Sequence, residues 1–305
     1  MYSAWLKFLT NQFELNDITQ VLVYTDQDQF WLLQGFYDVF KQNNIPISTQ
    51  FLDELSNEDG YDIQTSFEAI SETTLIMAIF SSSNPSLSKI NSVFPPLRQF
   101  VNYSGYSIVT IQEFQRQYFT DFLDMDFTTA LDKKNRYCSE FGSNHNYQLV
   151  SQDLELQFEL ESKFFAFPFH TSIQRHVLFP ATELIAEINP KTLNGKFTAN
   201  GTIGPFYSGE HLQDPFGRIR TPITFTLDEG IIVDIQGKDR LVSRLNNIIE
   251  LIENPEFTKI GMGIGPTIDL TGNIAVDKMI NNTYNLSLGN RQLDILLYDA
   301  KIHSL

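Results

Sequence analysis

Hydrophobic residues in the first half of the chain follow two alternating patterns. Continuous apolar runs at residues 21–25 and 75–80 are typical of strands that a parallel sheet buries on both faces. Between them, apolar side chains recur at i, i+3, i+4 and i+7 over residues 33–40, which predicts a helix with one buried stripe. Residues 47–52 follow a proline and predict a further strand.

Further helices are expected in this half at residues 67–70, 87–94 and, as one or two helices, 113–140. Strand–helix alternation at this spacing predicts a mostly parallel sheet with right-handed crossovers, in a Rossmann-like α/β domain. The turn after the first strand reads TDQDQF and contains no G-x-G-x-x-G phrase. Without those glycines the backbone cannot approach a pyrophosphate closely, so we expect no dinucleotide cofactor.

The pattern changes after a polar linker at residues 142–146. Apolar and polar residues alternate with period two over residues 154–160, as in an antiparallel strand with one buried face. Further short strands are expected at residues 164–169, 195–199, 223–227 and 231–235.

The turn Asp228–Glu229–Gly230 predicts that the last two of these strands form a hairpin. One amphipathic helix is expected at residues 239–252. The sequence therefore predicts two domains: a Rossmann-like α/β domain over residues 1–145 and an antiparallel α+β domain over residues 146–305.

Composition limits the classes of partner. The 305 residues include 21 Lys and Arg against 37 Asp and Glu, which gives a net charge of −16 and no basic run. Such a charge repels phosphate backbones and anionic membrane surfaces, so we expect neither a nucleic-acid nor a membrane partner. Cys138 is the single cysteine, so no intrachain disulfide can form, and this is typical of a cytoplasmic protein.

The candidate chemistry gathers near the end of the chain. Gly-rich turns at residues 261–265 and 289–290 separate short apolar strands whose side chains would converge on one place. A site could form there from Glu183, Met262, Asn285, Gln292 and Asp294. The set has the spacing of a metal site, but most of its side chains are poor metal ligands. The sequence contains no Walker A, H-E-x-x-H or G-x-S-x-G motif that would indicate another chemistry.

Five phrases in order along the chain resemble one family. They are DITQVLVYTD, SNHNYQLVSQDLELQFEL, FPATELIAEI, TPITFTLDEGIIVDIQG and DKMINNTYNLSLGN. Their series resembles the leucyl aminopeptidase (aminopeptidase T, M29-type) family of metallopeptidases and its relative, 2,5-dihydroxypyridine 5,6-dioxygenase. The last phrase is normally written around Glu-Lys…Gly-Thr-x-His-x-x-x-Gly. The resemblance implies a second domain like the metal domain of aminopeptidase T, and it implies a homodimer.

The resemblance also implies one or two divalent metals, held by two Glu, a strand His and a final His-x-Asp. Carried over position by position, these ligands fall on Glu183, Met262, Asn285, Gln292 and Asp294. Two carboxylates without imidazole cannot form a 2-His-1-carboxylate face and are a poor cage for zinc or iron. We therefore expect that the ancestral metal is lost and that the protein holds no metal.

The interpretation that follows is a metal-free, catalytically altered relative that binds a peptide or small polar ligand in the ancestral cleft. The candidate ligand-binding residues are Asn285, Gln292, Met262 and His303. Analogy with such relatives indicates an accessory role in modified-peptide biosynthesis. The alternative is a metal-dependent aminopeptidase or ring-opening dioxygenase with a rearranged site that uses Glu183, Asp294 and His303 or His176. A further alternative is metal-free catalysis, in which the candidate catalytic residues Glu183 and Asp294 act as a general acid/base pair.

Overall fold

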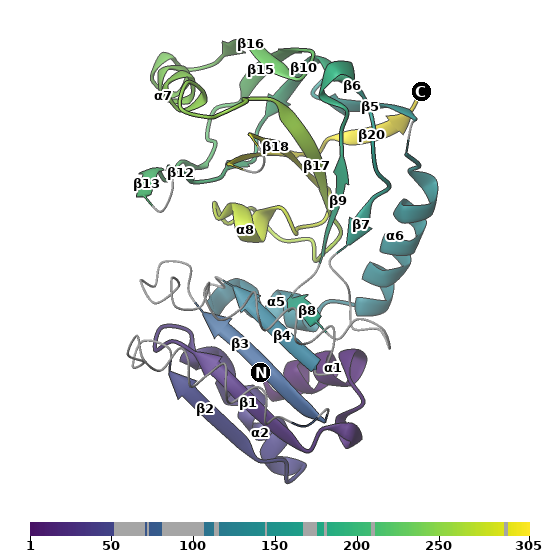
Figure 1. Cartoon of the computed structure of the whole chain (residues 1–305), viewed down its shortest axis with the longest axis vertical. Coiled ribbons are helices and arrows are strands. Elements are labelled where there is room, and N and C mark those ends of the chain that lie inside the picture. The colour runs from purple at the N-terminus through teal and green to yellow at the C-terminus, as the bar shows by residue number, and fades with distance from the viewer. Residues whose placement is uncertain are drawn as a thin grey trace. The chain divides into compact units, whose positions relative to one another are not determined.

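A computed structural model of the chain divides it into two compact units (Figure 1). Unit 1 consists of Met1–Met125 and Phe167–Ala181, and unit 2 of Asp126–Ala166 and Thr182–Leu305. The structure describes residues 1–51, 71, 73–80, 107–112, 116–143, 145–166, 176–179, 182–208, 211–289 and 292–305. Each unit is considered by itself below.

Unit 1 is built on a parallel five-stranded sheet with the order β2-β1-β3-β4-β8. Its strands are β1 (Gln20–Thr25), β2 (Ile47–Phe51), β3 (Thr74–Phe80), β4 (Ser107–Gln112) and β8 (His176–Phe179). The strands β1 and β3 are those that the two apolar runs predict, and β2 is the strand predicted after the proline. The edge strand β8 comes from later in the chain, inside the part that the sequence assigns to the second domain.

Helices of unit 1 supply an aromatic core. They are α1 (Tyr2–Gln12), η1 (Leu15–Asp17), η2 (Phe30–Leu33), α2 (Gln34–Gln42) and α5 (Arg116–Asp124). The centroid of the buried Trp5 ring lies 5.2 Å from that of Phe36, in an edge-on arrangement, and 5.4 Å from that of Phe119. The indole N–H of Trp5 donates to the carbonyl of Leu32. The hydrogen bond to Leu32 satisfies the one polar atom of this large buried side chain. The helices predicted at 67–70 and 87–94 lie outside the described residues.

Unit 2 contains two antiparallel sheets, with the orders β16-β15-β10-β6-β5-β20 and β14-β11-β19-β18-β17-β9-β7, and a separate hairpin of β12 and β13. The first sheet consists of β5 (Asn146–Ser151), β6 (Leu154–Glu159), β10 (Asn194–Ala199), β15 (Ile223–Asp228), β16 (Ile231–Gln236) and β20 (Lys301–Ser304). The second consists of β7 (Phe165–Ala166), β9 (Glu183–Glu187), β11 (Thr202–Ile203), β14 (Gly217–Arg218), β17 (Phe257–Gly263), β18 (Thr283–Leu288) and β19 (Leu293–Tyr298). The remaining elements are β12 (Phe206–Ser208), β13 (His211–Asp214), α6 (Phe127–Glu140), η4 (Pro190–Thr192), α7 (Asp239–Ile249) and α8 (Ile274–Asp277).

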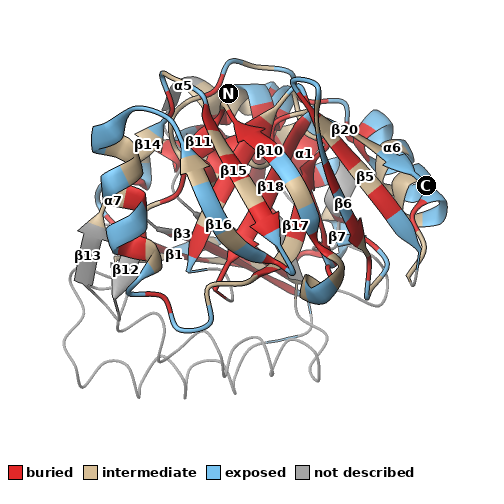
Figure 2. Ribbon diagram, turned by 90° about the horizontal axis from the view of Figure 1, so that it is seen from above, coloured by how far each residue is buried: buried red, intermediate tan, exposed pale blue. Residues whose placement is uncertain are grey.

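Both sheets contribute to one apolar core. Phe197 on β10 stacks on Phe225 of β15 with ring centroids 4.9 Å apart, and Phe257 on β17 meets Phe197 edge-on at 5.9 Å. All six residues of the central strand β18 are buried (Figure 2). The expected mixture of a parallel sheet with antiparallel sheets is thus confirmed.

Two local predictions can be followed in detail. The hairpin of β15 and β16 turns at Glu229 and Gly230, whose φ angles of 47° and 78° are those of a type I′ turn. Residues 113–140 contain two helices, α5 and α6. The compact units separate at residue 125/126, whereas the linker composition predicts 145/146, because α6 packs Tyr137 and Phe141 onto the core of unit 2. Among the described residues, no helix is long and apolar enough to cross a membrane.

Candidate functional site: a buried lysine and two carboxylates

Four polar side chains lie on one face of the second sheet of unit 2. Residues directly opposite each other in an antiparallel pair point to the same face, and alternate residues of one strand share that face. Ser287 on β18 lies opposite Asp294 on β19, and Asn285 is two residues before Ser287. On β9, Glu183 lies on the same face, across the intervening strand β17. The sequence thus brings Glu183, Asn285, Ser287 and Asp294 to neighbouring strands.

The intervening strand contributes glycine at the positions that face these side chains. Gly261 pairs with Asn285, and Gly263 pairs with Glu183. A Cβ atom on Gly261 would lie 2.7 Å from the carboxylate Oε1 of Glu183, and one on Gly263 would overlap the backbone oxygen of Ile280. Gly261 therefore leaves the space that the Glu183 carboxylate uses, and Gly263 allows the backbone at Ile280 to approach β17 closely.

Lys278 joins the two carboxylates. It follows the short helix α8, and its Nζ lies 3.3 Å from Oε2 of Glu183 and 3.6 Å from Oδ2 of Asp294. The side chains of Lys278, Glu183 and Asp294 are only 14%, 7% and 13% exposed, so this ion cluster is largely removed from water. The hydroxyl of Ser287 donates to Oδ1 of Asp294 at 2.6 Å, which satisfies the other carboxylate oxygen.

Asp277 fixes the segment that presents Lys278. This residue is 0% exposed, and its two oxygens accept hydrogen bonds from the hydroxyls of Thr202 and Thr271 and from the backbone N–H groups of Thr271 and Gly272. A buried carboxylate is tolerated when its lone pairs are used in this way. Asp277 is therefore an anchor for the turn, and Lys278 is the side chain that reaches the cluster.

Asn285 has an unused hydrogen-bonding atom. The residue is 1% exposed, and its Nδ2 lies 3.5 Å from Oγ of Ser287, at the limit of a hydrogen bond. Its Oδ1 is buried and accepts no hydrogen bond from the described part of the chain. A buried acceptor without a partner is uncommon and calls for a functional or structural explanation.

The structure brings together only part of the predicted site. Glu183, Asn285 and Asp294 meet in the cluster. Met262 points to the opposite face of β17 and belongs to the apolar core, because it pairs with Leu184 and Tyr284 rather than with their polar neighbours.

The other two predicted residues also lie away from the cluster. Gln292 is an exposed residue just before β19, and its backbone N–H caps the turn by donating to Leu288. His303 is exposed on β20, an edge strand of the other sheet of unit 2. Of the alternative histidine donors, His176 lies in β8 of the parallel sheet and His170 is outside the described residues.

Lys278 and Ser287 were not among the predicted residues. The signal for Lys278 is the Asp-Lys pair in DKMINNTYNLSLGN, which stands where the resembled family writes Glu-Lys. Ser287 could have been found from strand alternation, since it is two residues after Asn285.

The donor set does not fit the metal that the resemblance implies. Within the described segments, no three side chains of His, Cys, Asp or Glu gather in a way that could hold a metal ion. The two carboxylates at the carried-over positions already share the ammonium group of Lys278, so they offer less negative charge to a divalent cation than two unpaired carboxylates would. Asn285 offers a neutral amide in place of imidazole, a weaker ligand for a transition metal.

Comparisons with known proteins agree with the fold. No family model and no curated protein sequence matches the chain. The structure of 2,5-dihydroxypyridine dioxygenase from Pseudomonas putida KT2440 superposes with a TM-score of 0.63 at 12% identity, over 98% of this chain and 92% of that one. AmpT from Thermus thermophilus gives a TM-score of 0.58 at 9% identity, over 99% of this chain and 94% of that one. The resemblance is confirmed at the level of fold: the chain shares the fold of these two proteins.

Proposed function

We propose that the protein is a metal-free, catalytically altered relative of this fold that binds a peptide at the cluster of Glu183, Lys278 and Asp294. One observation carries the proposal: the Lys278 ammonium lies within 3.6 Å of both carboxylates that stand at the carried-over metal-ligand positions. A fixed ammonium can offset part of the negative charge there without the exchangeable cation of a metal site.

The charge of the cluster indicates which part of a peptide it would bind. Among the described residues, the cluster contains two carboxylates and one ammonium group, which is an excess of one acidic group. A ligand ammonium group would neutralise it, and a peptide carries such a group at its amino terminus. The side chains of Lys278 and Asp294 are 14% and 13% exposed, and we propose that the ligand amino group reaches the cluster from their side. We therefore expect recognition of a free α-amino group.

Asn285 supports the same class of ligand. Its buried Oδ1 accepts no hydrogen bond from the described residues, and an amide or ammonium N–H is the complementary donor. Filling this acceptor recovers the desolvation penalty of an unsatisfied buried oxygen, about 1–3 kcal/mol. A peptide amino terminus supplies both the positive charge and N–H donors at one place.

The test compares two peptides and two variants. Binding of Leu-Gly-Gly and of N-acetyl-Leu-Gly-Gly is measured by calorimetry on the full chain. We expect the free amine to bind and the acetylated peptide to bind at least about tenfold more weakly, since it lacks the charge-assisted hydrogen bond. Asp294→Asn should weaken binding of the free peptide, because the isosteric amide removes a negative charge from the cluster.

Asp299→Asn is the matched control. Asp299 is exposed, has a φ of 58° that asparagine tolerates well, and lies five residues after Asp294, so the substitution removes the same charge outside the cluster. Equal affinity for the two peptides, or equal effects of the two substitutions, would contradict the proposal. Metal content is measured in parallel on protein purified without chelator; a stoichiometric transition metal, or turnover of the peptide that depends on zinc or ferrous iron, would establish the metal-dependent alternative.

A further inference from the structure

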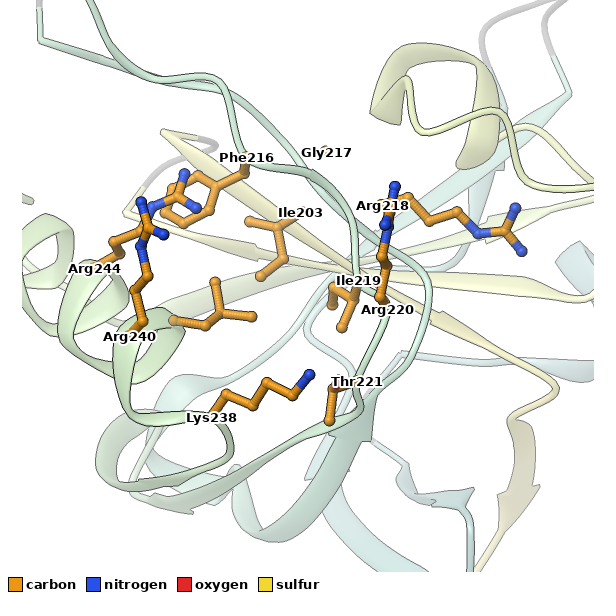
Figure 3. Close-up of a pocket in the computed structure, with 11 residues that line it drawn as sticks. Ile203, Phe216, Gly217, Arg218, Ile219, Arg220, Thr221, Lys238, Arg240 and Arg244 are labelled. Atoms are coloured by element: carbon orange, nitrogen blue, oxygen red, sulfur yellow. The ribbon is translucent and has the colours of Figure 1, made fainter.

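A second candidate site lies elsewhere in unit 2 and is independent of the proposed peptide site. It is a pocket of about 600 Å³ between the segment around β14 and the start of α7 (Figure 3). Five of the residues that line it are basic, although the chain as a whole has a net charge of −16. They are Arg218, Arg220, Lys238, Arg240 and Arg244. We call this site the basic pocket.

Two of these basic side chains are held by the fold. Arg244 forms a two-pronged ion pair with Asp214, with Nε 2.9 Å from Oδ2, and its guanidinium lies 4.9 Å from the centroid of the Phe216 ring. Arg218 donates from Nη1 to the carbonyl oxygen of Leu270 at 3.2 Å. In Figure 3 the Arg218 side chain extends away from Arg244.

The other three basic side chains have no such partner. Among the described residues, none forms a hydrogen bond or an ion pair with the side chains of Arg220, Lys238 and Arg240, which are all exposed. In Figure 3 Arg240 lies beside Arg244, close to the Phe216 ring, and Lys238 lies on the side of Thr221. Like charges that line one pocket give it a positive potential, so an anion inside it would be stabilised.

The helix α7 adds to the positive potential. Lys238 is its N-cap residue and makes no side-chain capping hydrogen bond, and Arg240 lies in the first turn. Basic side chains are disfavoured at a helix N-terminus, where the free N–H groups carry partial positive charge and favour anions. Asp239 is the single acidic residue of that turn, and it is exposed. The first turn of an eleven-residue helix thus presents cations where the backbone already favours an anion.

The floor of the pocket is apolar, which restricts the ligand further. Ile203 and Ile219 are 1% and 8% exposed, and Leu241 packs against the core of unit 2. A volume of about 600 Å³ lies in the range that small-molecule sites occupy and is far larger than the roughly 30 Å³ share of a water molecule. A bare inorganic ion would leave most of this space and the apolar floor unused.

We propose that the basic pocket binds a small organic anion, with a phosphate or carboxylate group at one or more of the unpaired side chains Arg220, Lys238 and Arg240 and an aromatic or aliphatic part against Ile203, Ile219 and Leu241. The acidic group would pair with the unpaired cations, and the apolar part would pack against the apolar floor. These two features of the pocket are independent of each other. Arginine and lysine recognise both oxyanions through charge-assisted hydrogen bonds.

Phenyl phosphate is the probe, because it combines the two parts, and inorganic phosphate is the comparison. Binding to the full chain is followed by NMR titration at low salt. We expect saturable binding of phenyl phosphate, weaker binding of inorganic phosphate, and a loss of about tenfold or more in the triple variant Arg220→Ala/Lys238→Ala/Arg240→Ala, because hydrogen bonds to charged groups contribute strongly.

The charge-matched control is the triple variant Lys191→Ala/Lys196→Ala/Lys301→Ala. These three lysines are exposed residues of the same unit and do not line the basic pocket, so their loss lowers the net charge equally. Binding that is not saturable, or that falls equally in both triple variants, would overturn the proposal and show only non-specific attraction. Because the two sites are independent, Asp294→Asn should leave phenyl phosphate affinity unchanged whether or not the peptide site exists.

Discussion

The Lys278 cluster and the basic pocket place cations in opposite situations within one unit. Lys278 is 14% exposed and lies between two carboxylates of the fold, so its charge is already offset. Arg220, Lys238 and Arg240 are exposed and form no ion pair with the described residues, so their charges are available to a ligand. A buried ion pair is therefore expected to contribute mainly to stability, and an exposed basic group mainly to ligand binding. Removing the first should reduce stability, and removing the second should reduce binding.

The largest expected effect comes from Lys278→Met, which keeps most of the side-chain volume and removes the charge. Two buried carboxylates would then face each other without a cation, and breaking a buried ion pair in this way costs about 3–5 kcal/mol. Urea denaturation at neutral pH measures the loss. Lys301→Met, at an exposed position of β20, is the control and should change the free energy of unfolding by less than about 0.5 kcal/mol.

The cluster interpretation also predicts a rescue. Combining Lys278→Met with Glu183→Gln and Asp294→Asn removes all three charges, and it should restore part of the lost stability. If Lys278→Met and Lys301→Met destabilise equally, Lys278 does not neutralise the carboxylates, and the contrast with the basic pocket disappears.

A smaller loss is expected from Asp277→Asn, which tests the anchor under Lys278. The new amide group would direct N–H donors at groups that are themselves donors, namely Thr202, Thr271 and Gly272. We expect a destabilisation of about 1–3 kcal/mol together with weaker peptide binding, since the turn that presents Lys278 would shift. Asp269→Asn, at an exposed position of the same loop, should change neither quantity. Unchanged peptide affinity in Asp277→Asn would mean that the anchor does not position Lys278.

Sequence patterns predicted several strands and three residues of the site, Glu183, Asn285 and Asp294. They did not predict Lys278 and Ser287. A pattern reports only on residues that are close together in the chain. Apolar runs and period-two alternation predicted β1, β3 and β6, because the pattern of apolar residues within a strand indicates which of its faces are buried. The same alternation explains why Met262 could not belong to the cluster: it is one residue away from Gly261, and a shift of one residue moves a side chain to the opposite face. The motif match assigned a position in the chain but did not fix the face of the strand.

Sequence patterns could not predict which distant segments of the chain lie next to one another. Strand β8 joins the parallel sheet of unit 1, although the segments Asp126–Ala166 and Thr182–Leu305 on either side of Phe167–Ala181 belong to unit 2. A four-residue strand gives no signal of its partner. The basic pocket was missed for the same reason. Residues 218–220 and 238–244 are separate in the sequence, and neither segment alone forms a basic run.

The smallest expected effect, and the finest test of the comparison, comes from Asp214→Asn. Burial alone would raise the pKa of Asp214, but the hydrogen bond from Arg244, the N–H of Phe216 and the charge of Arg244 outweigh it, so the pKa is lowered. A carboxylate with a lowered folded-state pKa stabilises the fold above its unfolded pKa, near pH 4, and this contribution is lost as pH falls through the folded value. Because Arg244 is 42% exposed, we expect a contribution below about 1 kcal/mol, measured as the difference in urea midpoint between pH 7 and pH 3, and Asp214→Asn should show a smaller difference.

Asp214→Asn removes a stabilising ion pair, but it should strengthen ligand binding. Without the Asp214 carboxylate, Arg244 becomes a fourth available cation of the basic pocket, and phenyl phosphate should bind up to about fivefold more tightly. The control is Asp234→Asn, an exposed residue of β16 in the same unit that does not line the pocket, which removes the same charge. A gain in affinity for Asp214→Asn alone would show that an ion pair of the fold withholds a cation from the ligand, as the two carboxylates do with Lys278. An equal gain in both variants would mean that the change in net charge alone explains the tighter binding. The distinction between cations paired within the fold and cations available to a ligand would then not hold.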